Sequence, residues 1–380
     1  MTQVETAKTA ETAQAAEAAE MGETVEAAET EQGGAGLRGA GPRRRGEAMR
    51  RAIRIGLRPG PWKRGLVLAA LAVLLGLCML LHARIPNRIG NLGSLMETTL
   101  PWFGLFIPAL LAGALWRRSA SAMTALLLPV AAWLHLFGGL LSDKSHQGGD
   151  LMLVSHNVRA DNPDPVATAR DLAASGADVL ALEEITAQAR PLYEKELAKE
   201  YPHHTVQGTV GLWSKLPLTD TRPVDTMMDY GPLADTKPAH VKMTYNRALR
   251  TTVTTKQGRL AVYVAHMGSA RVNPRTGFSA DSRDRNAQAL GKAIAAEQNE
   301  RVVLLGDLNG TMDDRAFADI TSRLRSTQEV AGSGFGFSWP ATFPVVRIDQ
   351  ILVRGVQPTS SWSLPATGSD HLPVAARINW

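Results

Sequence analysis

Apolar and polar positions divide the chain into three regions with different patterns. Residues 1–64 begin with Ala, Glu, Thr and Gln repeats that contain few large apolar side chains. Residues 65–141 hold three long runs without Lys, Arg, Asp or Glu, and from residue 151 short apolar segments alternate with amphipathic ones to the end of the chain. We therefore expect a disordered tail over residues 1–64, a helical module over residues 65–141 and a globular domain over residues 150–380.

The three apolar runs cover residues 65–81, 100–116 and 123–141. A helix needs about 20 largely apolar residues, within a range of roughly 17–25, to cross the hydrocarbon core of a bilayer. The first run alone is also compatible with a cleaved signal peptide, but two further runs close behind it favour an anchored module. Buried helices of a soluble protein are the other alternative, and such helices seldom lack charge on every face. The pattern predicts three transmembrane helices.

Basic residues are distributed unevenly around these runs. Residues 38–64 contain ten Lys or Arg and a single acid, and Arg117 and Arg118 separate the second and third runs, whereas Arg84 and Arg88 flank the opposite loop. Lys and Arg are enriched on the cytoplasmic side of membrane proteins. We therefore expect a multi-pass protein of the cell membrane, with a cytoplasmic N-terminal tail and the globular domain outside the cytoplasm.

Net charge separates the tail from the globular domain. The chain carries a formal charge of +5, but residues 151–380 contain 25 basic and 24 acidic side chains and so contribute only +1. Tight binding to a phosphate backbone requires a broad cationic surface, so we do not expect a nucleic acid partner. Cys78, which lies inside the first apolar run, is the only cysteine of the sequence. A single cysteine excludes a disulfide framework and a cysteine metal site within the chain.

The globular region has the alternation of an α/β domain. We predict strands near residues 151–157, 178–182, 210–214, 239–245, 259–266, 301–307, 347–353 and 373–380. We predict helices near residues 164–175, 186–200, 282–298 and 313–324. Mixed strands and helices over this length favour one domain.

Polar residues stand where several of these strands begin or end. They are Asn157, Glu183, Glu184, His266, Asp307, Asn309, Asp349, Asp370 and His371. Each alone has an ordinary structural explanation, as a turn former, an acid at a helix N-terminus or a buried histidine. Together they supply oxygen ligands for a hard cation and acid–base groups, at the strand ends where α/β folds gather their active sites. The combination favours metal-assisted phosphoryl transfer.

The ordered motifs around these residues resemble the endonuclease/exonuclease/phosphatase superfamily. They are Asn157-Val158, Leu-Glu-Glu ending at 184, His266, Gly-Asp-Leu-Asn over 306–309, Arg-Ile-Asp ending at 349 and Ser-Asp-His-Leu-Pro over 369–373. The resemblance covers residues 150–380 and implies a four-layer α/β sandwich of the deoxyribonuclease I type, here preceded by the three transmembrane helices.

The resemblance also implies a metal site. Glu184 would be the principal ligand of Mg²⁺, with Mn²⁺ as the alternative ion, and Asp370 would lie near the metal. Asn157 would contact both the ion and the substrate. One position departs from the usual Leu-Gln-Glu, because Glu183 stands where glutamine is expected. Side chains alternate along a strand, so Glu183 and Glu184 should not both face one ion.

The remaining residues would carry the reaction. By resemblance, Asp307 would be the base that orients or deprotonates the attacking water, and Asn309 would help to hold the phosphate. His371 would contact the scissile phosphate and take its orientation from Asp349. His266 would stabilise the phosphoryl oxygens or assist the leaving group.

A closer resemblance concerns the whole architecture. The three apolar runs, the Arg-rich leader and the run SWPATFPVVRIDQILV over residues 338–353 are similar to the VanJ-type teicoplanin-resistance proteins of actinobacteria. This resemblance implies a phosphatase or pyrophosphatase at the outer face of the membrane, acting on a lipid-linked polyprenyl phosphate in support of glycopeptide resistance. The bilayer and a phosphorylated lipid are then the expected partners.

Alternatives from other classes remain open. An extracytoplasmic nuclease would need a basic groove, and the nearest candidates are Arg271, Arg275, Arg283 and Arg285, which are interleaved with acids. A sphingomyelinase-like phosphodiesterase and an inactive membrane scaffold are the others, although a scaffold leaves the polar strand ends unexplained. An apolar lipid-facing groove formed by Trp213, Met227, Met228 and Tyr230 is a further hypothesis, with core or loop positions as the more ordinary interpretation.

Overall fold

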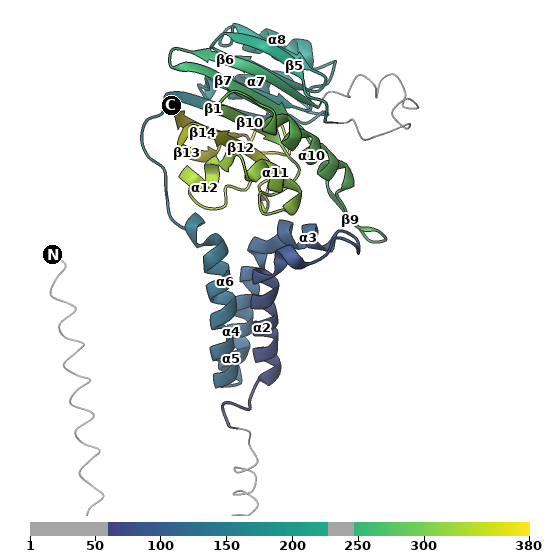
Figure 1. Cartoon of the computed structure of the whole chain (residues 1–380), viewed down its shortest axis with the longest axis vertical. Coiled ribbons are helices and arrows are strands. Elements are labelled where there is room, and N and C mark those ends of the chain that lie inside the picture. Colours follow the sequence, from purple (N-terminus) through teal and green to yellow (C-terminus); the bar gives the residue numbers. More distant parts are fainter. Residues whose placement is uncertain (1–59, 227–246) are drawn as a thin grey trace, which may run out of the picture. The chain divides into compact units, whose positions relative to one another are not determined.

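A computed structural model describes residues 60–226 and 247–380, and Figure 1 shows how their helices and strands are arranged. Residues 1–59 of the predicted tail lie outside the described residues. The same holds for the strand predicted near residues 239–245 and for Met227, Met228 and Tyr230 of the suggested groove.

The longer strands of the described residues form two six-stranded sheets. The first sheet contains, in order, β13 (Gln357–Ser363), β14 (Val374–Asn379), β1 (Leu151–Asn157), β2 (Val179–Glu183), β4 (Val210–Ser214) and β3 (His203–Gln207). The second contains β11 (Arg325–Ser326), β12 (Asp349–Arg354), β10 (Val302–Asp307), β7 (Gly258–Ala265), β6 (Ala248–Thr255) and β5 (Leu218–Pro223). The short strands β8 (Arg271–Asn273) and β9 (Gly277–Ser279) pair with each other.

The two sheets pack face to face over a shared apolar core. Alternation along β14 shows how the sequence specifies this arrangement, because side chains of a strand point to opposite faces in turn. Val374, Ala376 and Ile378 are buried in the core between the sheets, Ala375 packs into the layer outside the first sheet, and Arg377 is exposed. The terminal strand therefore lies inside the structure, between β13 and β1.

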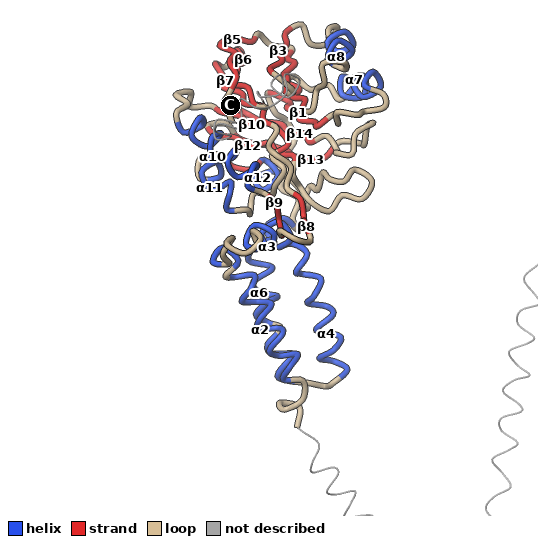
Figure 2. Tube along the Cα trace, turned by 90° about the vertical axis from the view of Figure 1, so that its right-hand side faces the viewer, coloured by secondary structure: helices blue, strands red, loops and turns tan. Residues whose placement is uncertain are grey.

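Helices cover the outer face of each sheet. The helices α7 (Pro165–Ala174) and α8 (Arg190–Leu197) pack on the first sheet, and α10 (Asp281–Ala295) and α11 (Ala318–Thr321) pack on the second, on the opposite side of the sandwich (Figure 2). Trp213 is fully buried beneath the first helical layer, so it occupies a core position rather than a lipid-facing groove. The expected four-layer α/β arrangement is confirmed.

The apolar region forms helices of unequal length. The helix α2 (Leu66–Leu80) has 15 residues. It is followed by a helical stretch containing α3 (Leu92–Thr99), η2 (Leu100–Leu105) and α4 (Phe106–Trp116), and by a second stretch containing α5 (Ala120–Ala125), α6 (Leu127–Phe137) and η3 (Gly138–Leu140). Among the described residues, two helical stretches, Leu92–Trp116 and Ala120–Leu140, are long and apolar enough to cross a membrane. Three transmembrane helices are therefore not confirmed, because α2 is shorter than the span that the sequence predicted.

Specific polar contacts join the apolar helices to the α/β domain. The carboxylate of Glu97, which is 1% exposed, pairs with the guanidinium of Arg315 at 2.7 Å between Oε1 and Nη2. The indole Nε1 of Trp102 donates to the carbonyl oxygen of Val345 at 2.9 Å. Loss of the partly exposed Arg315 would leave the buried carboxylate of Glu97 without its cation, so these contacts fix the helices to this part of the domain.

We predict that Ala376→Asp destabilises the protein by about 3 kcal/mol or more, because it buries an unpaired carboxylate between the two sheets. The neighbouring variant Arg377→Asp, which changes an exposed side chain of the same strand, should change stability by about 0.5 kcal/mol or less. Denaturant unfolding of the full chain in detergent measures both. Equal stabilities of the two variants would contradict the assigned position of β14.

Candidate active site

The polar strand ends meet at one edge of the sandwich. β1 and β2 run parallel, and Asn157 is the register partner of Glu183 at their carboxyl ends. In the second sheet β7 and β10 run parallel, and Asp307 at the end of β10 is the register partner of Asp349 at the start of antiparallel β12. Residues that are far apart in the sequence are thus brought to one place by the pairing of strands.

Unusual backbone conformations occur at this edge. Glu184 and Asn309 have φ angles of 62° and 52°, in the left-handed region that side chains other than Asn, Asp and Gly seldom adopt. Gly306 has a φ of 149°, and a Cβ there would lie 1.9 Å from the carbonyl oxygen of Ala265 on the adjacent strand. A glycine is therefore required before Asp307, and the strained conformation of Glu184 is of the kind that concentrates at functional sites.

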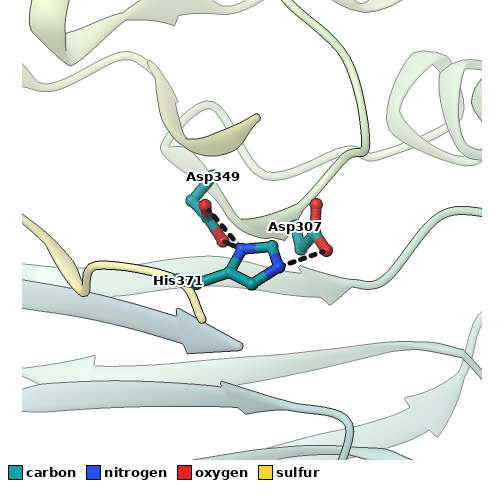
Figure 3. Close-up of side chains that lie close together, drawn as sticks. All are labelled: Asp307, Asp349 and His371. Carbon is teal, nitrogen blue, oxygen red and sulfur yellow. Dashed lines mark hydrogen bonds and ion pairs between the residues drawn. The ribbon is translucent and has the colours of Figure 1, made fainter. Parts of the chain in front are cut away.

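Asp349, His371 and Asp307 form the centre of the site (Figure 3). The Nδ1 atom of His371 lies 2.9 Å and 3.1 Å from the two carboxylate oxygens of Asp349, and its Nε2 atom lies 3.9 Å from Oδ2 of Asp307. Because a carboxylate only accepts, Nδ1 carries a proton. His371 takes this partner from the other sheet and not from the adjacent Asp370.

Burial and the neighbouring charges of this group shift the pKa values of His371 and Asp307. Burial lowers the pKa of His371, but the charge and hydrogen bond of Asp349, together with the charges of Asp307 and Asp370, outweigh it and raise the pKa to about 10. Burial and the nearby Asp349 raise the pKa of Asp307 to about 7, although His371 and two hydrogen bonds oppose the rise. His371 is therefore a cation at neutral pH, beside a carboxyl group that titrates near neutrality.

Two asparagines hold the Asp307 carboxylate in place. The Nδ2 atom of Asn157 donates to Oδ2 at 2.9 Å, and the backbone nitrogen of Asn309 donates to Oδ1 at 2.8 Å. The Nδ2 atom of Asn309 also donates to Oδ2, at 3.1 Å, and to the carbonyl oxygen of Met267 at 3.1 Å. In this arrangement both side-chain amides orient Asp307.

His266 connects Asp307 to Glu184. Its Nε2 atom lies 3.5 Å from Oε1 of Glu184 and 3.8 Å from Oδ2 of Asp307. The Nη2 atom of Arg247 lies 3.0 Å from Nδ1 and 3.3 Å from Nε2 of the same ring. Burial, Arg247 and His371 lower the pKa of His266 well below its usual value. His266 is therefore an uncharged imidazole that faces two carboxylates, and Arg247 is a residue that the sequence motifs did not indicate.

Glu183 and Glu184 point in different directions. Glu184 is 30% exposed and accepts a hydrogen bond from the backbone nitrogen of Ala160 at 2.9 Å. Glu183 is fully buried, accepts from the hydroxyl of Ser155 at 2.9 Å and has no hydrogen-bond partner for Oε2. Burial, and then the charge of Asp349, raise the pKa of Glu183 well above its usual value, which favours the uncharged acid. An uncharged glutamic acid has nearly the shape of the glutamine expected at this position.

Asp370 lies at the rim of the site. Its carboxylate is exposed and accepts a hydrogen bond from the indole Nε1 of Trp339 at 3.4 Å. The preceding residue, Ser369, is buried, donates to the carbonyl oxygen of Asn157 at 2.6 Å and accepts from the backbone nitrogen of His371. Ser369 thus ties the C-terminal motif to the end of β1, a function that its place in the sequence motif could have suggested.

One of the arginines considered for a nucleic acid groove lies inside the domain. Arg283 is fully buried and pairs with Asp314 at 2.6 Å and Asp284 at 2.8 Å. Arg271 and Arg275 lie on and beside the exposed strand β8. Because the charge of Arg283 is already neutralised inside the domain, it is not available to a phosphate backbone.

The acidic residues fit a divalent cation. Asp307, Asp349 and His371 each offer a ligand atom, and these atoms lie within 4.8 Å of one another. The hydrogen bond between Asp349 and His371 already engages Nδ1 and both oxygens of Asp349, so Asp307, the partly exposed Glu184 and the exposed Asp370 are the carboxylates left to face a cation. Oxygen donors and mutually repelling carboxylates suit Mg²⁺ or Mn²⁺.

Comparisons with known proteins found a family model that matches the chain and several similar solved structures. The model of the Endonuclease/Exonuclease/phosphatase family matches residues 154–371. Among solved structures, the chain is similar to a functionally unknown conserved protein of Enterococcus faecalis (15% identity, 60% of this chain, 99% of that chain, TM-score 0.49). It is also similar to D. rerio TDP2 complexed with a single-strand DNA product (18% identity, 60% of this chain, 99% of that chain, TM-score 0.49). A further similar structure is sphingomyelinase C from Streptomyces griseocarneus (20% identity, 61% of this chain, 100% of that chain, TM-score 0.42). No curated protein matches the sequence.

We predict that Asp349→Asn lowers the pKa of His371, because it removes the carboxylate that stabilises the imidazolium while burial remains. NMR titration of isotopically labelled histidine in the full chain measures the change. Asp370→Asn is the control, and it should lower the pKa by less because its carboxylate is exposed. A His371 that titrates alike in the wild type and in Asp349→Asn would show that Asp349 does not govern its charge.

Proposed function

Because the chain belongs to the Endonuclease/Exonuclease/phosphatase family, we propose that it is a membrane-anchored, divalent-metal-dependent phosphatase or pyrophosphatase that acts on a lipid-linked, polyprenyl-type phosphate outside the cytoplasm. Members of this family are generally metal-dependent phosphoesterases. The observation that supports a lipid substrate is the position of the site relative to the apolar helices. Asp307 is followed within eight residues by Arg315, whose guanidinium pairs with Glu97 at the start of the apolar stretch Leu92–Trp116.

The geometry supports a division of roles. Asp307, with a pKa of about 7 and three hydrogen bonds that fix its carboxylate, is suited to take a proton from water near neutral pH. The cationic His371, oriented by Asp349, is suited to donate to a phosphate oxygen. The neutral His266 places its Nε2 atom beside Glu184 and Asp307. A divalent cation held by Glu184, with Asp370 and Asn157 as the further ligands that the resemblance implies, would supply positive charge against the oxygens of the phosphate.

The proposal includes three membrane spans, and contacts at both ends of α2 support it. At one end, Ser119 donates to the carbonyl oxygen of Arg64, so the start of α2 lies beside the turn between the two longer apolar stretches. At the other end, Arg315 donates to the carbonyl oxygens of His82 at 3.0 Å and Ile85 at 2.7 Å. α2 therefore extends from the turn at one end of these stretches to the α/β domain at the other, and α2 also packs alongside α5 and α6.

The side of the membrane follows from the number of spans. With a cytoplasmic Arg-rich tail, three crossings put the domain outside, whereas two crossings would return it to the cytoplasm. The turn that contains Arg117 and Arg118 would then be cytoplasmic, as its charge favours. A polyprenyl carrier and a role in glycopeptide resistance complete the proposal and rest on the resemblance to the VanJ-type proteins.

We predict that the full chain in detergent releases phosphate from farnesyl pyrophosphate or farnesyl phosphate only with Mg²⁺ or Mn²⁺, and that chelation of the metal abolishes turnover. Asp307→Asn, Glu184→Ala and His371→Ala should each lower kcat/KM by at least about 100-fold. Asp171→Asn, which changes an exposed carboxylate on α7, is the control and should retain full activity.

Supercoiled DNA and sphingomyelin, offered to the same preparation, distinguish the alternatives. Nicked DNA without phosphate release from the prenyl substrates would favour the nuclease, and cleavage of sphingomyelin alone would favour the phosphodiesterase. Unchanged turnover in all three site variants would overturn the assignment of the active site itself.

We predict that a reporter enzyme that is active only outside the cytoplasm is active when fused after Trp380 and inactive when fused after Arg118. Three crossings place these two positions on opposite sides of the membrane. A cytoplasmic reporter at the C-terminus would show that α2 does not cross, and would leave the phosphatase assignment to be judged by the activity assays alone.

A further inference from the structure

An apolar groove lies where the membrane-type helices meet the segment that leads into the active site. It has a volume of about 480 Å³, and its lining includes Trp102, Leu105, Trp133, Leu134, Phe335 and Phe337. Ligand sites for small molecules have volumes of roughly 300–1,000 Å³ and predominantly apolar linings. The groove is therefore large enough to hold part of a hydrocarbon chain.

The aromatic side chains of the groove are held by both parts of the protein. Phe337 stacks on Trp102 with ring centroids 5.6 Å apart, and Phe335 lies 6.2 Å from Trp133. The indole Nε1 of Trp133 donates to the carbonyl oxygen of Pro101 at 2.9 Å. These contacts join η2, α6 and the segment before β12, so the wall of the groove is formed by helices and domain together.

The same segment continues directly into the active site. Ser338, the residue after Phe337, accepts hydrogen bonds from the backbone nitrogen of Asp349 at 3.3 Å, and its carbonyl oxygen accepts from the backbone nitrogen of Leu372 at 2.7 Å. Trp339 contacts the carboxylate of Asp370. Two residues of extended chain span at most about 7 Å, so the end of the groove formed by Phe337 is close to the residues around His371.

We propose that this groove binds the hydrocarbon chain of the lipid phosphate substrate while the phosphate lies at Asp307 and His371. The inference rests on the proposed function, and it names the part of the protein that would select a long-chain substrate. Leu105 and Leu134, which are 63% and 49% exposed, leave the groove open on the surface of the apolar helices. A chain already embedded in a bilayer reaches such an opening laterally, without passing through water.

Filling the groove tests the proposal. Leu134→Trp should lower kcat/KM for farnesyl phosphate by about tenfold and leave dimethylallyl phosphate, which has the same phosphate and a much shorter chain, within about twofold. The loss of contact for about two methylene groups is enough for a tenfold effect. Leu127→Trp is the matched control, because Leu127 lies on the same helix, is 67% exposed and does not line the groove. The full chain in mixed micelles is assayed with each substrate.

The outcomes separate this inference from the proposed function. A selective loss on farnesyl phosphate in Leu134→Trp, with Leu127→Trp unchanged, supports the groove. Equal effects of the two variants, or equal effects on both substrates, would overturn it and leave the lipid phosphatase assignment standing. If the wild type releases no phosphate from either prenyl substrate but cleaves DNA or sphingomyelin, the proposed function fails, and the groove assignment fails with it.

Discussion

The hydrogen bond between Asp349 and His371 joins the two sheets at the edge where every other polar group of the site gathers. Asp349 opens β12 in one sheet, and His371 precedes β14 in the other. Because both side chains are buried, each depends on the other for charge compensation, and the pair cannot form unless the sheets pack in their observed register. The core between the sheets thus determines the protonation of His371, and through it the electrostatic environment of Asp307.

The surplus of acids around this pair has a chemical consequence. The charge of Asp349 raises the pKa of both Asp307 and Glu183, the charge of Asp307 adds to the rise at Glu183, and His371 is a buried cation that pairs with Asp307 and Asp349. The surrounding fold holds these carboxylates in place, and the repulsion between them is relieved either by protonation or by a bound cation. The protonated form of Glu183 removes one charge, which explains how a chain with Glu in place of Gln keeps the same constellation.

The sequence predicted the strand ends that carry chemistry more reliably than it predicted the elements between them. The strands β1, β2 and β10 are aliphatic runs that end in polar residues. The apolar run and the polar residue at its end are both visible in the local sequence. The strand β6 was not predicted, because its Thr-rich sequence has weak apolar alternation and its burial comes from neighbouring strands. The length of α2 was overestimated, since composition does not show where a helix ends. The contacts of Arg247 and Arg315 depend on tertiary structure, and nothing in the local pattern distinguishes these two residues from surface residues.

The attachment of the domain to the apolar helices limits which substrates the site can reach. A flexible linker would let the domain sample a large volume, and tethering would then raise the effective concentration of many membrane substrates only moderately. Here Glu97 and Arg315 fix the segment that follows Asp307, and Trp102 fixes the segment that precedes Asp349. The strands β10 and β12 are therefore restrained close to the ends that carry Asp307 and Asp349. Under the proposed function, a site held at a fixed height above the bilayer would favour a phosphate carried at the membrane surface over one in solution. The ion pair and the indole contact would then be as relevant to the choice of substrate as the residues that touch the phosphate.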